Sequence, residues 1–98
     1  MANKNKYDIK STAQFKKDYK LAKKRGLDIK LLAKVINTLA AGEALPATCK
    51  DHSLKGKWNG YRECHIQPDW LLVYQIIKGT LVLTLSRTGT HSDIFGNE

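Results

Sequence analysis

Proton-carrying, cationic and aromatic side chains are concentrated between residues 50 and 70 of the sequence. This stretch contains His52, His65, Asp69 and both tryptophans, and its basic residues include Lys50, Lys55, Lys57 and Arg62. Side chains of these kinds can bind a phosphodiester and cut it. We therefore treat these four basic residues as candidates for substrate binding. The same residues could also form a basic surface that does no chemistry.

Cleavage of RNA without a metal is the reaction that these side chains fit. A 2′-hydroxyl attacks the adjacent phosphate, and the reaction needs a base, an acid for the leaving oxygen and a fixed cation. Histidine can take either proton role near neutral pH, and arginine binds phosphate bidentately. The candidates for catalysis are His52, His65, Asp69, Arg87 and His91.

The three histidines and Asp69 could instead hold a metal ion such as Zn²⁺. The sequence has no ligand pair at i and i+4 of an expected helix and no short Cys/His spacing, which favours a site without metal or cofactor. Cys49 and Cys64 lack the C-x-x-C spacing. We expect two free thiols, with a disulfide or a metal pair as the alternative.

The composition is that of a small and strongly basic protein. The 98 residues predict one domain, residues 1–98, and the formal net charge is +8. This excess of positive charge favours polyanionic partners, namely nucleic acid, an anionic membrane or an acidic protein. No apolar run approaches the ~20 residues that span a bilayer, and no secretory signal follows the basic N-terminus. We expect a cytoplasmic protein.

Two helices are expected in the first half of the chain. Thr12 suits the N-cap of a helix that ends near Gly26, and Asp28 suits the cap of a second helix that ends near Gly42. Apolar residues recur at helical spacing in both segments: Phe15, Tyr19 and Ala22, then Ile29, Leu32, Val35, Ile36 and Leu39. The short link predicts an antiparallel hairpin. The lysines of the first helix are a solvated face or, alternatively, a ridge that faces nucleic acid.

Four strands are expected, at residues 7–11, 61–67, 70–77 and 80–86, with 43–57 as a loop. Turns are expected at Pro68-Asp69 and at Lys78-Gly79, so the last three strands should form an antiparallel meander. The order β-α-α-β-β-β predicts an α+β fold, in which an antiparallel sheet carries the helical hairpin on one face.

Strand alternation predicts where the candidate side chains lie. Cys64 and Ile66 should face the core, whereas His65 should lie on the sheet face away from the helices. Leu81, Leu83 and Leu85 should share one face, and strict alternation would place Arg87 with them. The last strand must therefore twist, bulge or end before Arg87. Antiparallel pairing then makes His65, Asp69, Trp70 and Arg87 neighbours at one edge of the sheet.

Residues 50–58, 60–74 and 87–95 resemble the YafQ branch of the RelE/ParE toxin superfamily. The combined pattern H…H-x-x-x-D-W…R-x-x-x-H-x-x-x-F carries this resemblance, which covers nearly the whole chain and matches the RelE-like fold. It implies a type II toxin that enters the ribosomal A site and cuts messenger RNA. A cognate antitoxin, expected to carry an acidic segment that folds over the basic cleft, would neutralise the toxin. DNA would be bound only indirectly, through the antitoxin.

The resemblance also implies roles for individual residues. The family's active-site positions fall on His52, His65, Asp69, Trp70, Arg87, His91 and Phe95. Our hypothesis is that His91 transfers a proton, as the acid for the leaving oxygen, and that Arg87 stabilises phosphate charge; the sequence does not settle which group is the base and which the acid. Asp69, with His52 or His65, would supply the base. Trp70 and Phe95 would bind the message.

Two other functions are compatible with a small basic chain. A ParE-like toxin poisons DNA gyrase by binding and would be expected to lack the histidine and aspartate set. A plain RNA- or DNA-binding module would contain the histidines only incidentally.

Overall fold

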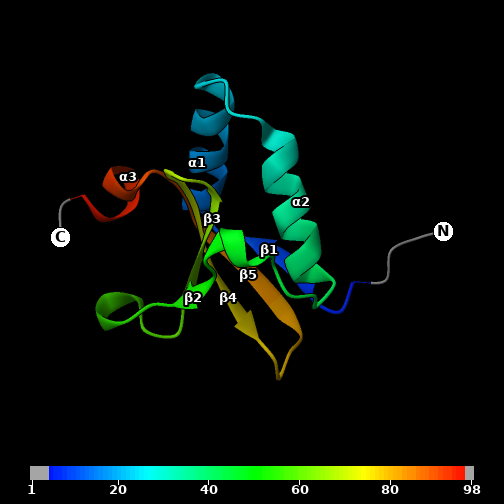
Figure 1. Ribbon diagram of the computed structural model, residues 1–98. Helices are drawn as coiled ribbons and strands as arrows, with labels where there is room; N and C mark the ends of the chain where they lie inside the picture. Colours follow the sequence, from blue (N-terminus) through cyan, green and yellow to red (C-terminus); the bar gives the residue numbers. More distant parts are fainter. Residues whose placement is uncertain (1–4, 97–98) are drawn as a thin grey trace.

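The structure, a computed structural model, describes residues 5–96 of the chain (Figure 1). The elements are, in order, β1 (Asp8–Ser11), α1 (Ala13–Lys24), α2 (Ile29–Ala40), the 3-10 turn η1 (Ala47–Cys49), β2 (His52–Ser53), the 3-10 turn η2 (Gly56–Trp58), β3 (Arg62–Gln67), β4 (Trp70–Ile77), β5 (Val82–Gly89) and α3 (His91–Phe95). The predicted α+β class with a helical hairpin is confirmed. Positions 1–4 and 97–98 of the predicted domain, including the start of the basic N-terminus, lie outside the described residues.

The five strands form one sheet in the order β1-β5-β4-β3-β2. The predicted antiparallel meander of β3, β4 and β5 is confirmed. Two features differ from the prediction. β1 runs parallel to β5, so the sheet is mixed. The short strand β2 pairs with β3 inside the segment predicted as a loop, because two residues in register with β3 leave no alternating pattern in the sequence.

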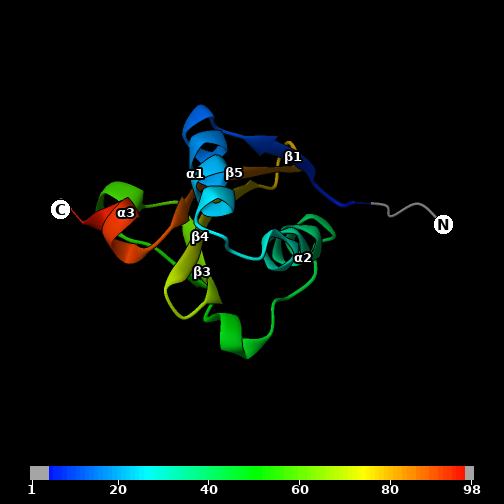
Figure 2. The same ribbon diagram turned by 90° about the horizontal axis from the view of Figure 1, so that it is seen from above.

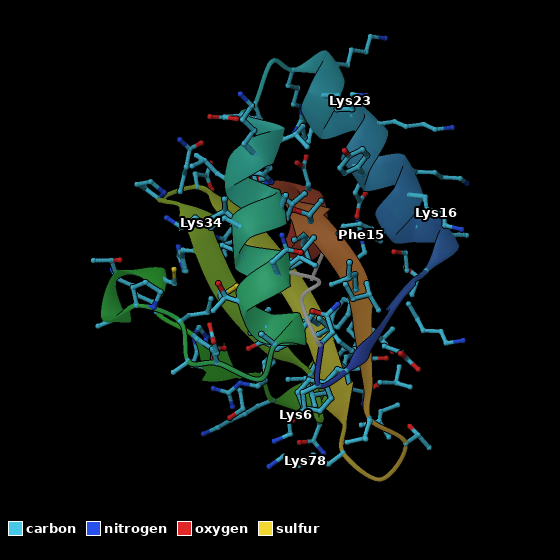
Figure 3. All side chains as sticks on the ribbon, turned by 90° about the vertical axis from the view of Figure 1, so that its right-hand side faces the viewer. Lys6, Phe15, Lys16, Lys23, Lys34 and Lys78 are labelled. Atoms are coloured by element: carbon cyan, nitrogen blue, oxygen red, sulfur yellow. The ribbon has the colours of Figure 1, made fainter. Side chains whose placement is uncertain are left out.

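The helical hairpin forms as its capping residues predict. Thr12 Oγ1 accepts a hydrogen bond from Phe15 N at 3.0 Å, and Asp28 Oδ1 accepts one from Lys30 N at 3.0 Å. The Phe15 side chain points toward the sheet, whereas Lys16 and Lys23 extend from the outer side of α1 (Figure 3). No helix within residues 5–96 is long and apolar enough to cross a bilayer.

Strand β4 is buried on both faces and separates two apolar clusters. On the side of the helices, Trp70, Leu72 and Tyr74 join the main core. On the other side, Leu71 and Val73 form a smaller cluster with Ile94 of α3. Figure 2 shows α2 and α3 on opposite sides of the sheet. Because the apolar side chains of β4 alternate between the two faces of the sheet, each face is covered by its own layer of helix.

Strand β5 differs from its predicted range of 80–86 because the preceding turn is longer than expected. The turn runs from Lys78 to Leu81, and Leu81 is 48% exposed with a φ of 56°. It is therefore not on the buried face with Leu83 and Leu85. In the β4–β5 pairing, Tyr74 opposes Leu85 and Val73 opposes Arg87, so Ser86 is the extra residue of a β-bulge.

The bulge resolves the alternation conflict at Arg87. Because the register shifts at Ser86, Arg87 shares a face with its partner Val73, on the side away from the helices, instead of with Leu83 and Leu85. The prediction that the strand twists, bulges or ends before Arg87 is confirmed in the form of a bulge.

Replacing Leu83 with Ala should lower the free energy of unfolding by about 2–5 kcal/mol, because Leu83 is fully buried and the smaller side chain leaves a cavity. Urea denaturation measures this loss. Leu81→Ala, two residues earlier and on the exposed turn, is the matched control and should change stability by no more than about 0.5 kcal/mol. Equal losses in the two variants would contradict the burial of β5.

Candidate active site

The three histidines, Asp69 and Phe95 gather around the β3–β4 turn and α3, on the sheet face away from the helical hairpin. His65 of β3 pairs with Leu71, which belongs to the smaller apolar cluster on that face. Its predicted orientation is therefore confirmed. The side chain of His65 is 18% exposed, whereas those of His52 and His91 are 53% and 56% exposed. All three rings are therefore accessible to a ligand.

A carboxylate lies between two of the histidines. Glu63 Oε1 is 3.5 Å from His52 Nε2 and 3.8 Å from His65 Nε2. His52 opposes Glu63 across the β2–β3 pair, and His65 follows two positions along β3, so the three side chains share a face. Glu63 is only 4% exposed. A buried carboxylate in contact with two imidazoles can stabilise a proton on either ring.

Backbone carbonyls select the tautomers of these two histidines. His52 Nδ1 is 2.8 Å from the oxygen of Lys50, and His65 Nδ1 is 3.2 Å from the oxygen of Pro68. Because a carbonyl oxygen only accepts hydrogen bonds, Nδ1 carries the hydrogen in both rings. Nε2 is therefore the nitrogen of each ring that can take up a proton.

Helix α3 brings the third histidine to the site. The His91 ring lies 6.0 Å from that of His65 and 6.0 Å from that of Phe95, centroid to centroid. His91 Nδ1 is 3.9 Å from Asp69 Oδ1 in the β3–β4 turn. The three imidazoles and Asp69 thus form one continuous group, which is what the family resemblance implies.

The start of α3 is fixed by a capping box. Thr90 Oγ1 accepts from Asp93 N, and Asp93 Oδ2 accepts from Thr90 N at 2.9 Å. Thr90 is therefore the N-cap, and the helix begins at His91. The buried Ile94 anchors α3 on Leu71 and Val73.

Arg87 extends away from the histidines. Its Nε donates to Asp18 Oδ2 of α1 at 2.7 Å, and its side chain is 22% exposed. Asp69, Trp70 and Arg87 nevertheless line one cavity of about 270 Å³, next to the end of α1. The predicted proximity of these three residues is confirmed, and Asp69 lies between this cavity and His91.

Two predicted substrate-binding residues do not lie with the histidines. Trp70 is 2% exposed on the helix side of β4, where its Nε1 donates to Thr88 Oγ1 at 2.9 Å, so its ring is not available for stacking on a base. Arg62 opposes Tyr74, whose side chain is in the main core, and its Nε donates to Asp51 Oδ1 at 3.2 Å. Alternation along β3 and β4 sends both side chains to the covered face.

The remaining candidates lie at the surface. Lys50, Lys55 and Lys57 are exposed on the segment that contains η1, β2 and η2. Phe95 packs edge-on against Trp58, with ring centroids 6.0 Å apart. Trp58 was not predicted as a site residue, and its place on a loop gave no periodic signal. Glu63 and Asp18 were also missed, although each had a signal: Glu63 shares a strand face with His65, and Asp18 interrupts the apolar face of α1.

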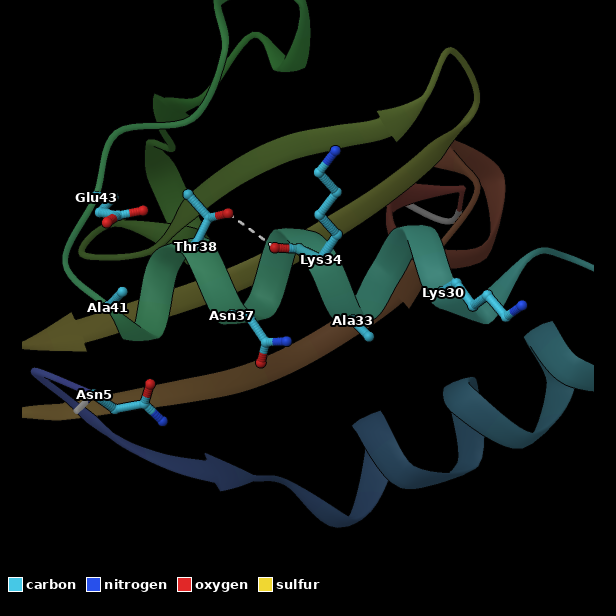
Figure 4. A pocket seen from close by; sticks show the side chains of 8 residues that line it. All are labelled: Asn5, Lys30, Ala33, Lys34, Asn37, Thr38, Ala41 and Glu43. Atoms are coloured by element: carbon cyan, nitrogen blue, oxygen red, sulfur yellow. Dashed lines mark hydrogen bonds between the residues drawn. The ribbon is translucent and has the colours of Figure 1, made fainter. Parts of the chain in front are cut away.

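Two other features could carry chemistry, a hollow along α2 and the two cysteines. A hollow of about 600 Å³ runs along the outer side of α2, where Lys30, Lys34 and Glu43 line it without any histidine (Figure 4). Cys49 and Cys64 are free thiols, and burial raises the pKa of Cys64 well above its usual value. Among residues 5–96, no three His, Cys, Asp or Glu side chains are grouped so that they could hold a metal ion.

Comparisons with known proteins converge on one family. A family model described as "Bacterial toxin of type II toxin-antitoxin system, YafQ" matches residues 7–96. The mRNA interferase toxin YafQ of Escherichia coli (strain K12) is 45% identical over 91 residues, which are 91% of this chain and 96% of that protein.

Solved structures of similar toxins agree with this family. The E. coli DinJ-YafQ toxin-antitoxin complex contains a chain with a TM-score of 0.85 and 42% identity, covering 93% of this chain and 99% of that one. A metal-bound toxin from Helicobacter pylori has a TM-score of 0.86 and 47% identity, covering 91% and 99%.

Acid should weaken the attachment of α3 through Asp93. Arg25 Nη1 lies 2.7 Å from Asp93 Oδ2, and the hydrogen bonds from Arg25 and then from Thr90 N lower the pKa of Asp93 to about 2. A carboxyl whose pKa falls on folding adds stability above its unfolded pKa, and this is lost as the pH falls through the folded value. Wild type should therefore lose stability between about pH 4 and pH 2 that Asp93→Asn does not lose.

Urea denaturation at several acidic pH values measures this difference. Arg25→Gln removes the first cause of the pKa shift and should show a smaller acid-dependent loss than wild type. Identical pH dependences in wild type and Asp93→Asn would contradict the ion pair.

Proposed function

The chain belongs to the YafQ family of type II toxin-antitoxin toxins, and on this basis we propose that it is an endoribonuclease that cleaves messenger RNA in the ribosomal A site. The observation that carries the proposal is the approach of His65 and His91 to within 6.0 Å, with Asp69 beside His91 and Glu63 beside His65. At this separation, both imidazoles can contact oxygens of one phosphodiester.

The proposed reaction needs no metal. His65 Nε2 takes the proton of the 2′-hydroxyl, whose oxygen attacks the adjacent phosphorus. The bond from phosphorus to the 5′-oxygen breaks, and protonated His91 gives its proton to that oxygen. The products are a 2′,3′-cyclic phosphate and a 5′-hydroxyl. Arg87 stabilises the charge on the phosphate oxygens during the attack.

Each of the two proton-transfer residues has a carboxylate beside it. Glu63 contacts His65, so it stabilises the imidazolium that forms when His65 takes up a proton. His52 contacts the same Glu63 oxygen and supports it from the other side. Asp69, expected from the sequence on the side of the base, lies next to His91 and instead orients the acid.

The surface around the histidines suits a single-stranded message. The exposed Lys50, Lys55 and Lys57 supply cations for backbone phosphates. Phe95, braced by Trp58, supplies an aromatic surface for an unpaired base. These groups bind any sequence, so the ribosome would select the phosphodiester by holding the message in the A site.

We also propose that a cognate antitoxin neutralises the chain, as the E. coli relative is found in a complex with DinJ. A net charge of +8 favours an antitoxin with an acidic segment that covers the basic surface. Any contact with DNA would be made by the antitoxin, and no membrane is involved. Ribosomes and messages place the activity in the cytoplasm.

Translating ribosomes programmed with a defined message test the proposal, with cut ends mapped by primer extension. Wild type should cut within the codon in the A site. A ParE-like toxin would leave the message whole and block supercoiling by gyrase, and a plain binding module would do neither. Loss of cutting in a zinc-selective chelator, with recovery on adding Zn²⁺, would overturn the metal-free mechanism.

Replacing His91 with Ala should lower the rate of message cleavage about 100-fold or more, because the leaving oxygen then has no acid. Growth arrest on expression should disappear as well. Lys78→Ala, at the exposed β4–β5 turn, is the control and should cleave at the wild-type rate. A folded His91→Ala protein that cleaves normally would remove His91 from proton transfer.

Replacing Glu63 with Gln should reduce cleavage about 10-fold, because the amide keeps the size of the side chain but has no negative charge to stabilise the imidazolium. Single-turnover rates on programmed ribosomes measure this. Glu43→Gln, an exposed glutamate near α2, makes the same chemical change away from the histidines and should have no effect. If both variants retain the wild-type rate, Glu63 has no part in catalysis.

A further inference from the structure

Asp18 is a buried carboxylate on a helix whose outer side carries lysines. It lies in α1 between Phe15 and Ala22, on the side that faces the sheet, and it is 8% exposed. Charged side chains are rarely buried unless they are paired, because removing a carboxylate from water is costly. The hydrogen-bond partners of Asp18 therefore explain why a carboxylate is buried at this position.

Each carboxylate oxygen of Asp18 accepts two hydrogen bonds. Oδ2 accepts from Arg87 Nε at 2.7 Å and from Thr88 N at 3.1 Å. Oδ1 accepts from Gln14 Nε2 at 3.0 Å and from Arg87 Nη2 at 3.3 Å. The carboxylate thus binds the guanidinium side-on and also satisfies the backbone of Thr88, at the edge of β5 beyond the end of β1.

The bulge at Ser86 makes this contact possible. It turns Arg87 toward the face of the sheet that carries the histidines, and the guanidinium then reaches back around the edge of β5 to α1. Because β1 pairs with β5 only as far as Leu85, nothing from the sheet covers this edge at Arg87 and Thr88. Helix α1 supplies Asp18 there.

The hydrogen bonds of Arg87 determine which of its nitrogens can donate to a phosphate. Its hydrogen bonds to described residues use Nε and Nη2, and Nη2 also donates to the backbone oxygen of Asp93 at 3.4 Å. Nη1 is the nitrogen left for a substrate. Arg87 lines the same cavity as Asp69, whose Oδ1 lies 3.9 Å from His91 Nδ1, so this cavity connects the guanidinium to the histidine side of the site.

We propose that Asp18 is a positioning residue for the reaction: its carboxylate fixes the Nε and Nη2 edge of Arg87, so that the guanidinium presents Nη1 to the scissile phosphate. This inference rests on the proposed cleavage of messenger RNA. A fixed cation stabilises the transition state without having to be reoriented during the reaction. Loss of Asp18 should therefore lower kcat and leave KM nearly unchanged.

A double-mutant cycle tests the proposal on programmed ribosomes. Asp18→Asn keeps one oxygen to accept from Thr88 N, but it removes the negative charge and places an NH₂ group against the guanidinium. Its kcat should fall about 10-fold or more, whereas in an Arg87→Gln background the same change should cost less than about twofold. Asp8→Asn, at an exposed position of β1, is the matched control and should leave kcat unchanged.

The Nε–H signal of Arg87 in NMR spectra gives a readout that does not need activity. Its exchange with solvent should be slow in wild type and fast in Asp18→Asn. Should Asp18→Asn fail to fold, Asp18→Glu keeps the charge but shifts the carboxylate by one methylene, and it should show the same loss of kcat and the same faster exchange.

The outcomes separate two failures. Wild type that cuts no message would refute the proposed function. Wild type that cuts, with an Asp18 variant that keeps the wild-type kcat or loses the same factor with and without Arg87, would overturn the positioning role.

Discussion

The burial of β4 on both faces is the constraint on which the rest of the structure depends. Its alternating side chains join the main core under the helical hairpin and the smaller cluster under α3. A strand that is apolar on both faces must be covered on both faces. The long hairpin covers one side, and the short C-terminal helix with the η2 segment covers the other. Because the second cover is small, it leaves the ends of β3 and β5 accessible, and His65 and His91 lie there.

The helical hairpin also stabilises the opposite face, although it packs on the other side of the sheet. Asp18 reaches Arg87 around the edge of β5, and Arg25 at the end of α1 pairs with Asp93 in α3. Two carboxylate–guanidinium contacts, each between residues far apart in the sequence, thus connect α1 to the site. The bulge at Ser86 allows the first, and the capping box of α3 orients the second. The geometry of the site therefore depends on the outer layer as well as on the sheet.

The sequence predicts most of the fold because its signals are local. Thr12 and Asp28 cap the helices as expected, and the turn at Asp69 closes the β3–β4 hairpin. The same alternation places His65 correctly. It could not reveal β2, whose two residues depend on pairing with β3, or the parallel partner of β1, since partner choice is set by tertiary packing. Trp70 was assigned to the substrate because a family pattern does not distinguish a ring that binds a base from one that packs beneath the site.

The small size of the apolar cluster under α3 affects how the protein unfolds on heating or in denaturant. Ile94 anchors α3 on Leu71 and Val73, Phe95 adds an edge-on contact with Trp58, and an exposed ion pair adds little. Segments held by so few buried groups open in sub-global fluctuations, at a free energy well below that of complete unfolding. Such an opening carries His91 away from His65 while the main core on the hairpin side stays intact. On the proposed role of His91, inactivation on heating should precede the cooperative melting of the sheet, so that the activity and the fold would differ in thermal tolerance.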